Sequence, residues 1–173
     1  MLRRLSALCI VVVAVLAATR GHPSPASPAS PSRKPAPHVH EAPGLARLDP
    51  ALHAALRRAG RAAGGDGVEL VVDSGWRSPA HQARLLREAI ATYGSEAEAR
   101  RWVATPNTSA HVSGDAVDIG RSGAAWLSAH GAAYGLCRIY ANEPWHFELR
   151  RQAVGHGCPP MYADPTHDPR MQP

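Results

Sequence analysis

Apolar residues recur every three to four positions in four stretches of the chain, the spacing of one buried helix face. An Asp-Pro pair at 49–50 and a Ser-Pro pair at 78–79 are typical helix starts, whereas Gly64, Gly65 and Gly94 are typical helix ends. Ser95 and Glu98 form a capping box for a further helix. These signals predict helices over about 50–63, 79–93, 96–103 and 122–133.

Short β-branched or alternating stretches lie between these helices. They predict strands at about 68–72, 115–119, 136–141 and 145–150, with 106–114 as a loop. In the second strand, Val117 and Ile119 should share one face, while Ala116 and Asp118 share the other. Since helices and strands mix without a repeated βαβ order, the expected fold class is α+β.

The first 43 residues differ in composition from the rest. An uncharged apolar run of 14 residues, 5–18, follows two arginines and is too short for a comfortable membrane span of ~20 residues. We expect residues 1–21 to be a signal peptide, with an uncleaved membrane anchor as the alternative. Residues 22–43 contain seven prolines and are expected to be an extended linker. A domain at 44–160 and a flexible tail at 161–173 complete the predicted organisation.

Positive charge is not concentrated on the predicted domain. The formal net charge is +5, but residues 1–43 hold five basic residues and one acid, whereas residues 44–173 hold 14 basic and 13 acidic residues. A nucleic-acid-binding domain carries a clustered basic surface, so nucleic acid is not an expected partner. The domain holds two cysteines, Cys137 and Cys158. An exported protein favours a disulfide between them, with free buried thiols or zinc ligands as alternatives.

Two clusters of ionisable residues could supply a metal site. In Ser-Ala-His-Val-Ser-Gly-Asp-Ala-Val-Asp, residues 109–118, a bend at Gly114 can fold His111 back over Asp118. In Glu-Pro-Trp-His-Phe-Glu, residues 143–148, strand alternation points Trp145 and Phe147 to the core and His146 and Glu148 to the opposite face.

Together the clusters offer two imidazoles, one carboxylate ligand and a spare carboxylate at Glu143. That is the pattern of a catalytic zinc site with an open position for water, where the spare carboxylate moves the proton. The alternative is a capped turn with hydrogen-bonded core His and Asp residues. Arg77 follows a strand and precedes a helix, where it could bind a carboxylate or simply pair with Asp73 on the surface.

The ordered set of segments SGWRS, YGSEAEARRWVA, SAHVSGDAVDIG, WLSAHGAAYGL and EPWHFEL resembles the VanY-type D-alanyl-D-alanine carboxypeptidases from about Leu48 to Arg150. The resemblance implies a Hedgehog/DD-peptidase-like fold, in which a small antiparallel sheet carries the zinc site. It implies Zn²⁺ held by His111, Asp118 and His146, with Glu143 as catalytic base and acid. Arg77 would bind the terminal carboxylate or steady the oxyanion. The remaining residues that the resemblance places at the substrate site are Ser109, Gln82, Trp145 and Tyr140.

These features predict an exported zinc peptidase that removes the terminal D-alanine from peptidoglycan stem peptides. Its expected location is the cell wall, either secreted or attached to the membrane through the N-terminal segment, and we expect a monomer. The alternatives are an L,D-carboxypeptidase, a D,D-dipeptidase, an endopeptidase or a non-catalytic wall-binding module.

Overall fold

The computed structural model describes residues 44–172, so the predicted signal peptide and linker lie outside the described part. The helices are α1 (Pro50–Gly65), α2 (Pro79–Tyr93), α3 (Glu96–Ala99), α4 (Ala110–Ser113) and α5 (Arg121–His130). The strands are β1 (Val72–Ser74), β2 (Ala116–Ile119), β3 (Leu136–Arg138) and β4 (His146–Leu149). Within 44–172, no helix is both long and apolar enough to cross a bilayer.

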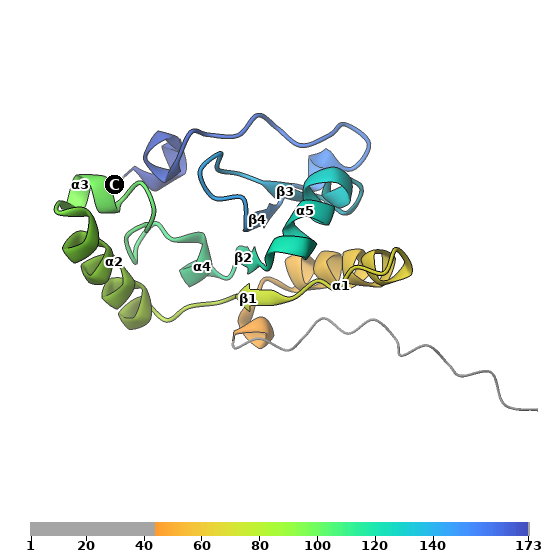
Figure 1. The fold of residues 1–173 in the computed structure, drawn as a ribbon, viewed down its shortest axis with the longest axis horizontal. Helices are drawn as coiled ribbons and strands as arrows, with labels where there is room; N and C mark the ends of the chain where they lie inside the picture. The colour runs from red at the N-terminus through yellow and green to blue at the C-terminus, as the bar shows by residue number, and fades with distance from the viewer. Residues whose placement is uncertain (1–43, 173) are drawn as a thin grey trace, which may run out of the picture. The chain divides into compact units, whose positions relative to one another are not determined.

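The four strands form one antiparallel sheet in the order β1-β2-β4-β3, which confirms the α+β class (Figure 1). Helices α1 and α5 lie on one side of the sheet, and α2 and α3 lie toward the other. In the central pair of strands, Asp118 of β2 lies opposite His146 of β4, and Ala116 lies opposite Glu148. The register therefore places ionisable residues from distant parts of the sequence side by side.

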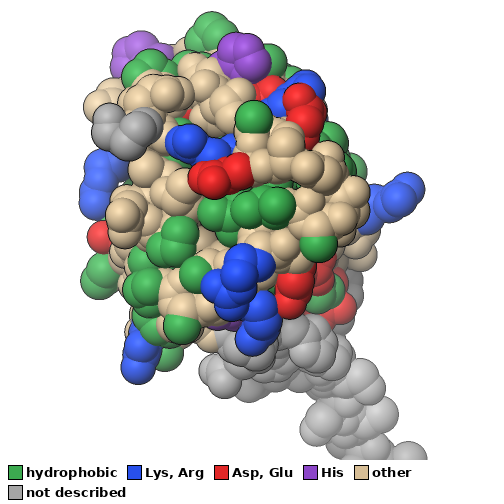
Figure 2. Space-filling view, turned by 90° about the vertical axis from the view of Figure 1, so that its left-hand side faces the viewer, with side chains coloured by type: hydrophobic (Ala, Val, Ile, Leu, Met, Phe, Trp, Pro, Cys, Tyr) green, Lys and Arg blue, Asp and Glu red, His purple; other side chains and the backbone are tan. Residues whose placement is uncertain are grey.

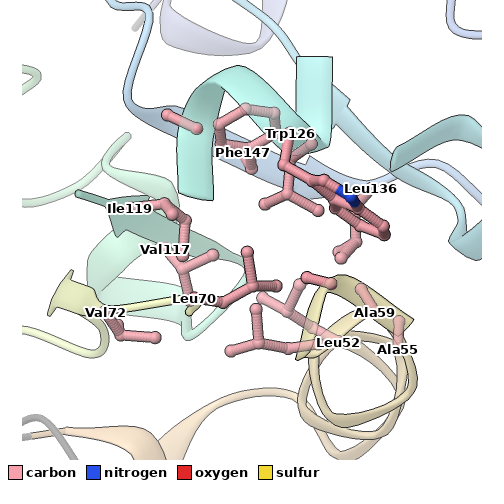
Figure 3. Packing of buried hydrophobic residues seen from close by; sticks show 14 of the residues in the cluster. Leu52, Ala55, Ala59, Leu70, Val72, Val117, Ile119, Trp126, Leu136 and Phe147 are labelled. Carbon is pink, nitrogen blue, oxygen red and sulfur yellow. The ribbon is translucent and has the colours of Figure 1, made fainter. Parts of the chain in front are cut away.

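The hydrophobic core fills the space between the sheet and helices α1 and α5 (Figure 3). Leu52 and Leu56 of α1 pack there with Val117, Ile119 and Phe147 from the strands, and all five are fully shielded from solvent. Burial of side chains of this size contributes about 1.5–3 kcal/mol each. Since alternate strand residues face the core, Asp118, His146 and Glu148 are left to the opposite face.

Helix starts follow their sequence signals more closely than the other element boundaries do. Asp49 accepts hydrogen bonds from the backbone of Ala51 and Leu52, and Ser78 accepts one from His81. The strand predicted at 68–72 instead occupies 72–74, because pairing with β2 rather than local propensity defines it. The helix predicted to reach 103 ends at Ala99, and a short helix, α4, occupies part of the predicted loop.

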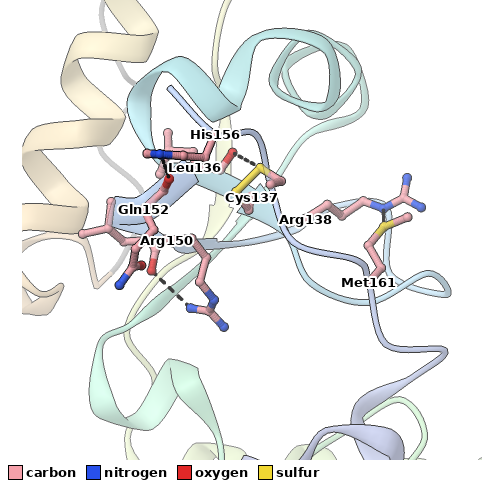
Figure 4. The surroundings of a disulfide bond; sticks show 9 residues. Leu136, Cys137, Arg138, Arg150, Gln152, His156 and Met161 are labelled. Carbon is pink, nitrogen blue, oxygen red and sulfur yellow. Dashed lines mark hydrogen bonds between the residues drawn. A yellow bond between two sulfur atoms is a disulfide. The ribbon is translucent and has the colours of Figure 1, made fainter. Parts of the chain in front are cut away.

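A disulfide bond joins Cys137 of β3 to Cys158, whose Cα atoms are 5.6 Å apart (Figure 4). The next residues are not the loose tail that composition suggested. Asp164 and Asp168 are almost fully buried, and each caps a short 3-10 helix, at Pro165–His167 and Pro169–Met171. The expectation of a flexible segment at 161–173 is therefore wrong for the described residues up to 172. Its Asp-Pro pairs are the same cap signal that begins α1.

Removing the disulfide should destabilise the domain. Because the bond closes a loop with a sequence separation of 21 residues, the double variant Cys137→Ala/Cys158→Ser should lose about 3 kcal/mol of unfolding free energy. Urea unfolding followed by circular dichroism measures the difference. The single variant Met161→Ala, in the same segment but 45% exposed, is the control. A loss below about 1 kcal/mol would contradict the expected constraint on the unfolded chain.

Candidate metal centre and active site

Three buried side chains meet on the face of the sheet that points away from the core. His111 comes from α4, Asp118 from β2 and His146 from β4. Asp118 Oδ1 lies 3.2 Å from His111 Nε2 and 3.3 Å from His146 Nδ1, and those two nitrogens are 3.3 Å apart. Ligands in a tetrahedral zinc site with bonds of ~2.0–2.1 Å are separated by about 3.3–3.4 Å. The three atoms thus have the spacing of one face of such a site.

The turn at Gly114 makes this meeting possible. Gly114 has a φ of 85° and ends α4, so the chain reverses between His111 and Asp118. A Cβ atom built there would lie 2.7 Å from the carbonyl oxygen of Arg47, so the position excludes a side chain. The sequence predicted a bend at this residue. It did not predict α4, because four residues give too little periodicity to detect.

Hydrogen bonds to the outer nitrogens select which imidazole atoms face the centre. His111 Nδ1 lies 2.8 Å from the carbonyl oxygen of Gly75, so it carries the proton and donates it. His146 Nε2 lies 3.2 Å from Glu148 Oε1 and donates in the same way. His111 Nε2 is then unprotonated and faces His146 Nδ1 at 3.3 Å. A cation that took the place of a proton on His146 Nδ1 would be stabilised between the two nitrogens. Metal-binding histidines are oriented in this way by outer acceptors.

The electrostatic surroundings also favour a cation. Burial lowers the pKa of His111, so this side chain is neutral. Burial opposes ionisation of Asp118, but the two histidines outweigh it and hold the pKa of the carboxyl well below its usual range. Burial also disfavours a charged His146, yet its hydrogen bonds to Asp118 and Glu148 raise its pKa to about 9. The cluster of carboxylates attracts positive charge, and a metal ion would compete with a proton for His146 Nδ1.

Glu143 lies beside the cluster of His111, Asp118 and His146, but its carboxylate is not one of the three converging groups. Its Oε2 is 3.7 Å from His146 Nδ1, and its Oε1 is buried without a hydrogen-bond partner among the described residues. Burial raises the pKa of Glu143 to about 7. A carboxyl group with a pKa near neutrality is suited to accept and return a proton. Pro144 follows Glu143, which lies just before β4, where the sequence placed the spare carboxylate.

Three residues of the site hold the guanidinium of Arg77, so only part of it can bind a ligand. Nη2 pairs with Asp118 Oδ2, Nε donates to Ser74 Oγ at 2.9 Å, and Nη1 donates to Gln82 Oε1 at 3.4 Å. The pair with Asp118 leaves Oδ1 of that carboxylate for a metal. It also replaces the alternative pairing with Asp73, for which the structure shows no contact to Arg77 within the described residues.

A cavity of about 190 Å³ opens in front of these groups. Four residues predicted from the sequence to contact substrate line this cavity, namely Gln82, Ser109, Tyr140 and Trp145. The cavity is also lined by Trp102, Pro165 and Met171, which the sequence did not point to. Pro165 and Met171 come from the segment expected to be flexible. Its composition suggested a tail, so these residues were not expected at the cavity.

Two tryptophans are exposed around this cavity. Trp145 is 41% exposed, so the prediction that it shares the core face with Phe147 is wrong. The reason is that β4 begins only at His146, which frees Trp145 from strand alternation. Trp102 is 38% exposed and stacks on Tyr93 with ring centroids 5.9 Å apart. Hydrophobic side chains lie among arginine and acidic side chains on the face that carries α2 and α3 (Figure 2).

The arrangement of these side chains agrees with the family that the chain matches. The model of the VanY D-alanyl-D-alanine carboxypeptidase family matches residues 45–150. A D-alanyl-D-alanine carboxypeptidase of Enterococcus faecalis is 35% identical over 112 residues, which cover 50% of this chain and 42% of that relative. The chain thus matches less than half of the relative's length.

Two solved structures share the fold. A vancomycin-resistance D,D-pentapeptidase, VanY of the VanB-type cassette, in complex with Zn(II) is 31% identical with a TM-score of 0.55. That match covers 59% of this chain and 72% of the other. VanYB in complex with D-alanine-D-alanine is 30% identical with a TM-score of 0.58, covering 62% of this chain and 75% of the other.

Proposed function

The chain belongs to the VanY D-alanyl-D-alanine carboxypeptidase family, and from this premise we propose that it is a zinc-dependent peptidase. Its substrate would be a peptidoglycan stem peptide, and it would hydrolyse the terminal amide between two D-alanines. The observation that carries the proposal is the convergence of three atoms that can bind a metal beside a buried oxygen of Glu143 that has no hydrogen-bond partner within residues 44–172. The relatives crystallised with Zn(II) and with D-alanine-D-alanine support the choice of metal and substrate.

His111 Nε2, Asp118 Oδ1 and His146 Nδ1 would hold the zinc ion. When bound, Zn²⁺ lowers the pKa of water toward ~7 and polarises the carbonyl under attack. Glu143 takes the proton from the attacking water on its free carboxylate oxygen and passes it to the nitrogen of the leaving amino acid. A nearby cation would oppose the effect of burial on Glu143 and keep the carboxylate ionised before the reaction.

Arg77 would act in two ways. Its contact with Asp118 Oδ2 fixes the carboxylate so that Oδ1 faces the metal. Each Nη atom has a second N–H beyond its contact with Asp118 or Gln82, and Arg77 lines the cavity. Those donors suit the terminal carboxylate of a peptide or the oxyanion that forms during attack. Gln82 is held in turn by donating to the carbonyl of Ala104 at 2.9 Å.

Replacing Arg77 by lysine should separate charge from geometry. Arg77→Lys keeps a positive charge but loses the planar fork, so we expect kcat/KM to fall about 100-fold, as for loss of one preorganised donor. Zinc content, measured by atomic absorption, should stay near that of the wild type. Arg84→Lys on the exposed face of α2 is the matched control, since within residues 44–172 the Arg84 side chain forms an ion pair with Glu88 alone, at 3.4 Å. Activity within twofold of wild type for Arg77→Lys would contradict the role.

The reaction itself is tested with a synthetic pentapeptide that ends in D-Ala-D-Ala. Incubation with zinc-loaded protein followed by mass spectrometry should show the loss of one alanine. Parallel reactions with free D-Ala-D-Ala and with the tetrapeptide test the alternatives. Hydrolysis of free D-Ala-D-Ala without cleavage of the pentapeptide would indicate a D,D-dipeptidase, and cleavage only of the tetrapeptide would indicate an L,D-carboxypeptidase. Binding without any release would favour a wall-binding module. The N-terminal composition supports a further part of the proposal, namely that the enzyme is exported to the cell wall.

A further inference from the structure

The outer nitrogen of His146 begins a chain of polar contacts that leads away from the cavity. Nε2 lies 3.2 Å from Oε1 of Glu148, two residues further along β4. Glu148 has no exposed surface, so its carboxylate needs partners within the protein. Two arginines provide them: Arg150 Nη2 and Arg170 Nη1 each lie 2.7 Å from Glu148 Oε2.

The two arginines are not equivalent. Arg170 also places Nη2 at 3.3 Å from Oε1, the same carboxylate oxygen that faces the imidazole. The Arg150 contact involves Oε2 alone. A planar guanidinium that contacts both oxygens fixes the rotation of a carboxylate, whereas a contact to one oxygen does not. Arg170 therefore determines where Glu148 Oε1 points, and Arg150 mainly balances its charge.

Arg170 is itself held from the other side. Its Nε donates to Asp168 Oδ1 at 3.0 Å, and its Nη2 pairs with Asp168 Oδ2. Asp168 is fully buried and accepts a hydrogen bond from the hydroxyl of Tyr140 at 3.0 Å. The ring of Tyr140 lies 5.2 Å from the imidazole of His146, measured between ring centroids. The contacts thus form a closed ring of residues that begins and ends at His146.

Two of the five residues in this ring lie outside the part of the chain that the family model matches. Asp168 and Arg170 follow the matched residues 45–150 and belong to the C-terminal segment. That segment has other attachments to the domain, which include the disulfide at Cys158 and the pair between Arg101 Nε and Asp164 Oδ2 at 3.1 Å. Arg170 is therefore not needed merely to keep the segment in place.

We propose that Arg170 is a positioning residue for the metal centre. It holds Glu148 so that Oε1 accepts a hydrogen bond from the Nε2–H of His146. The lone pair of Nδ1, on the side of Asp118 Oδ1 and His111 Nε2, would then be the one available to a metal ion. The inference rests on the proposed function, because it takes those three atoms as the ligands of a divalent cation. Through Arg170, a segment beyond the family match becomes part of the metal site.

The test measures metal binding without substrate. Arg170→Ala in the full chain should bind Zn²⁺ about tenfold more weakly, the lower end of the range for outer partners of metal-binding histidines. Competition with a chromophoric chelator gives the dissociation constant. The visible absorption spectrum of the Co²⁺-substituted protein should shift as well, because the ligand field depends on imidazole orientation. Glu148→Gln should change both readouts in the same direction, and Arg170→Lys should restore the affinity only in part.

Arg101→Ala is the matched control, since it removes a different arginine contact to the same segment and does not touch Glu148. Its zinc affinity should stay within twofold of wild type. The inference is overturned if Arg170→Ala retains wild-type affinity and cobalt spectrum, or if Arg101→Ala weakens binding equally. If circular dichroism shows that Arg170→Ala does not fold, the same two readouts on Glu148→Gln decide. A wild-type protein that binds no zinc would instead refute the proposed function, and the inference with it.

Discussion

Replacing Glu143 by glutamine is expected to lower kcat by about 1,000-fold, within the range of about 10²–10⁴ for loss of a general acid–base group. The carboxyl of Glu143 is the only proposed group that both accepts the proton of the attacking water and returns it to the leaving amine. Glutamine has nearly the same size and shape but cannot take up a proton. The defect should therefore appear in kcat, with KM changed little.

Zinc content separates this role from a role in metal binding. Because Glu143 Oε2 lies 3.7 Å from His146 Nδ1 and the carboxylate is not one of the three converging ligands, Glu143→Gln should still hold one zinc per chain. Glu96→Gln, at the exposed start of α3, is the control and should keep full activity. Turnover of Glu143→Gln within tenfold of wild type would show that another group moves the proton.

The convergence of His111, Asp118 and His146 could be predicted from the sequence because two local features are strong. A glycine between His111 and Asp118 allows the reversal that brings them together, and strand alternation puts His146 opposite the core-facing Phe147. What joins the two halves is the pairing of β2 with β4. That pairing is a long-range contact, and no local pattern specifies it. At the sequence level, the family resemblance implied that the two clusters meet at one metal ion, but it did not give the strand pairing that brings them together.

The walls of the cavity were harder to predict. Pro165 and Met171 lie in a segment whose proline content suggested a loose tail, yet they line the site. The disulfide and the buried aspartates hold that segment, and each depends on partners elsewhere in the fold, such as Arg101 and Tyr140. Two Asp-Pro pairs were a usable signal, because the same pair correctly marked the start of α1. Each of these pairs begins a helix of three residues, which is too short to show the apolar repeat that identified α1.

The position of Trp145 illustrates a different limit. Alternation from Phe147 predicts that Trp145 faces the core, but the regular strand begins one residue later, at His146. Strand boundaries shift by a residue or two, and a residue just outside a strand has no assigned face. As a result, the exposed ring of Trp145 lines the cavity instead of packing in the core.

Loss of a single ligand should have an effect as large as loss of the base, but for a different reason. In His111→Ala, the remaining Asp118 and His146 offer two ligand atoms instead of three. We expect zinc affinity to fall by more than about 100-fold, beyond the range for outer partners of a ligand. Activity should disappear with the metal. Chelator titration and zinc content measure the first effect, and the pentapeptide assay measures the second.

Metal removal from the wild type gives the decisive comparison for His111→Ala. A chelator should abolish wild-type activity, and added Zn²⁺ should restore it, because the ligand atoms remain. The same addition should not restore His111→Ala. His81→Ala on α2 is the control. The His81 side chain does not line the cavity, and the backbone N–H that donates to Ser78 Oγ is kept in the variant. Zinc-restored activity in His111→Ala would mean that Nε2 is not a ligand, and the imidazole would then be a hydrogen-bonded core residue attached to the carbonyl of Gly75.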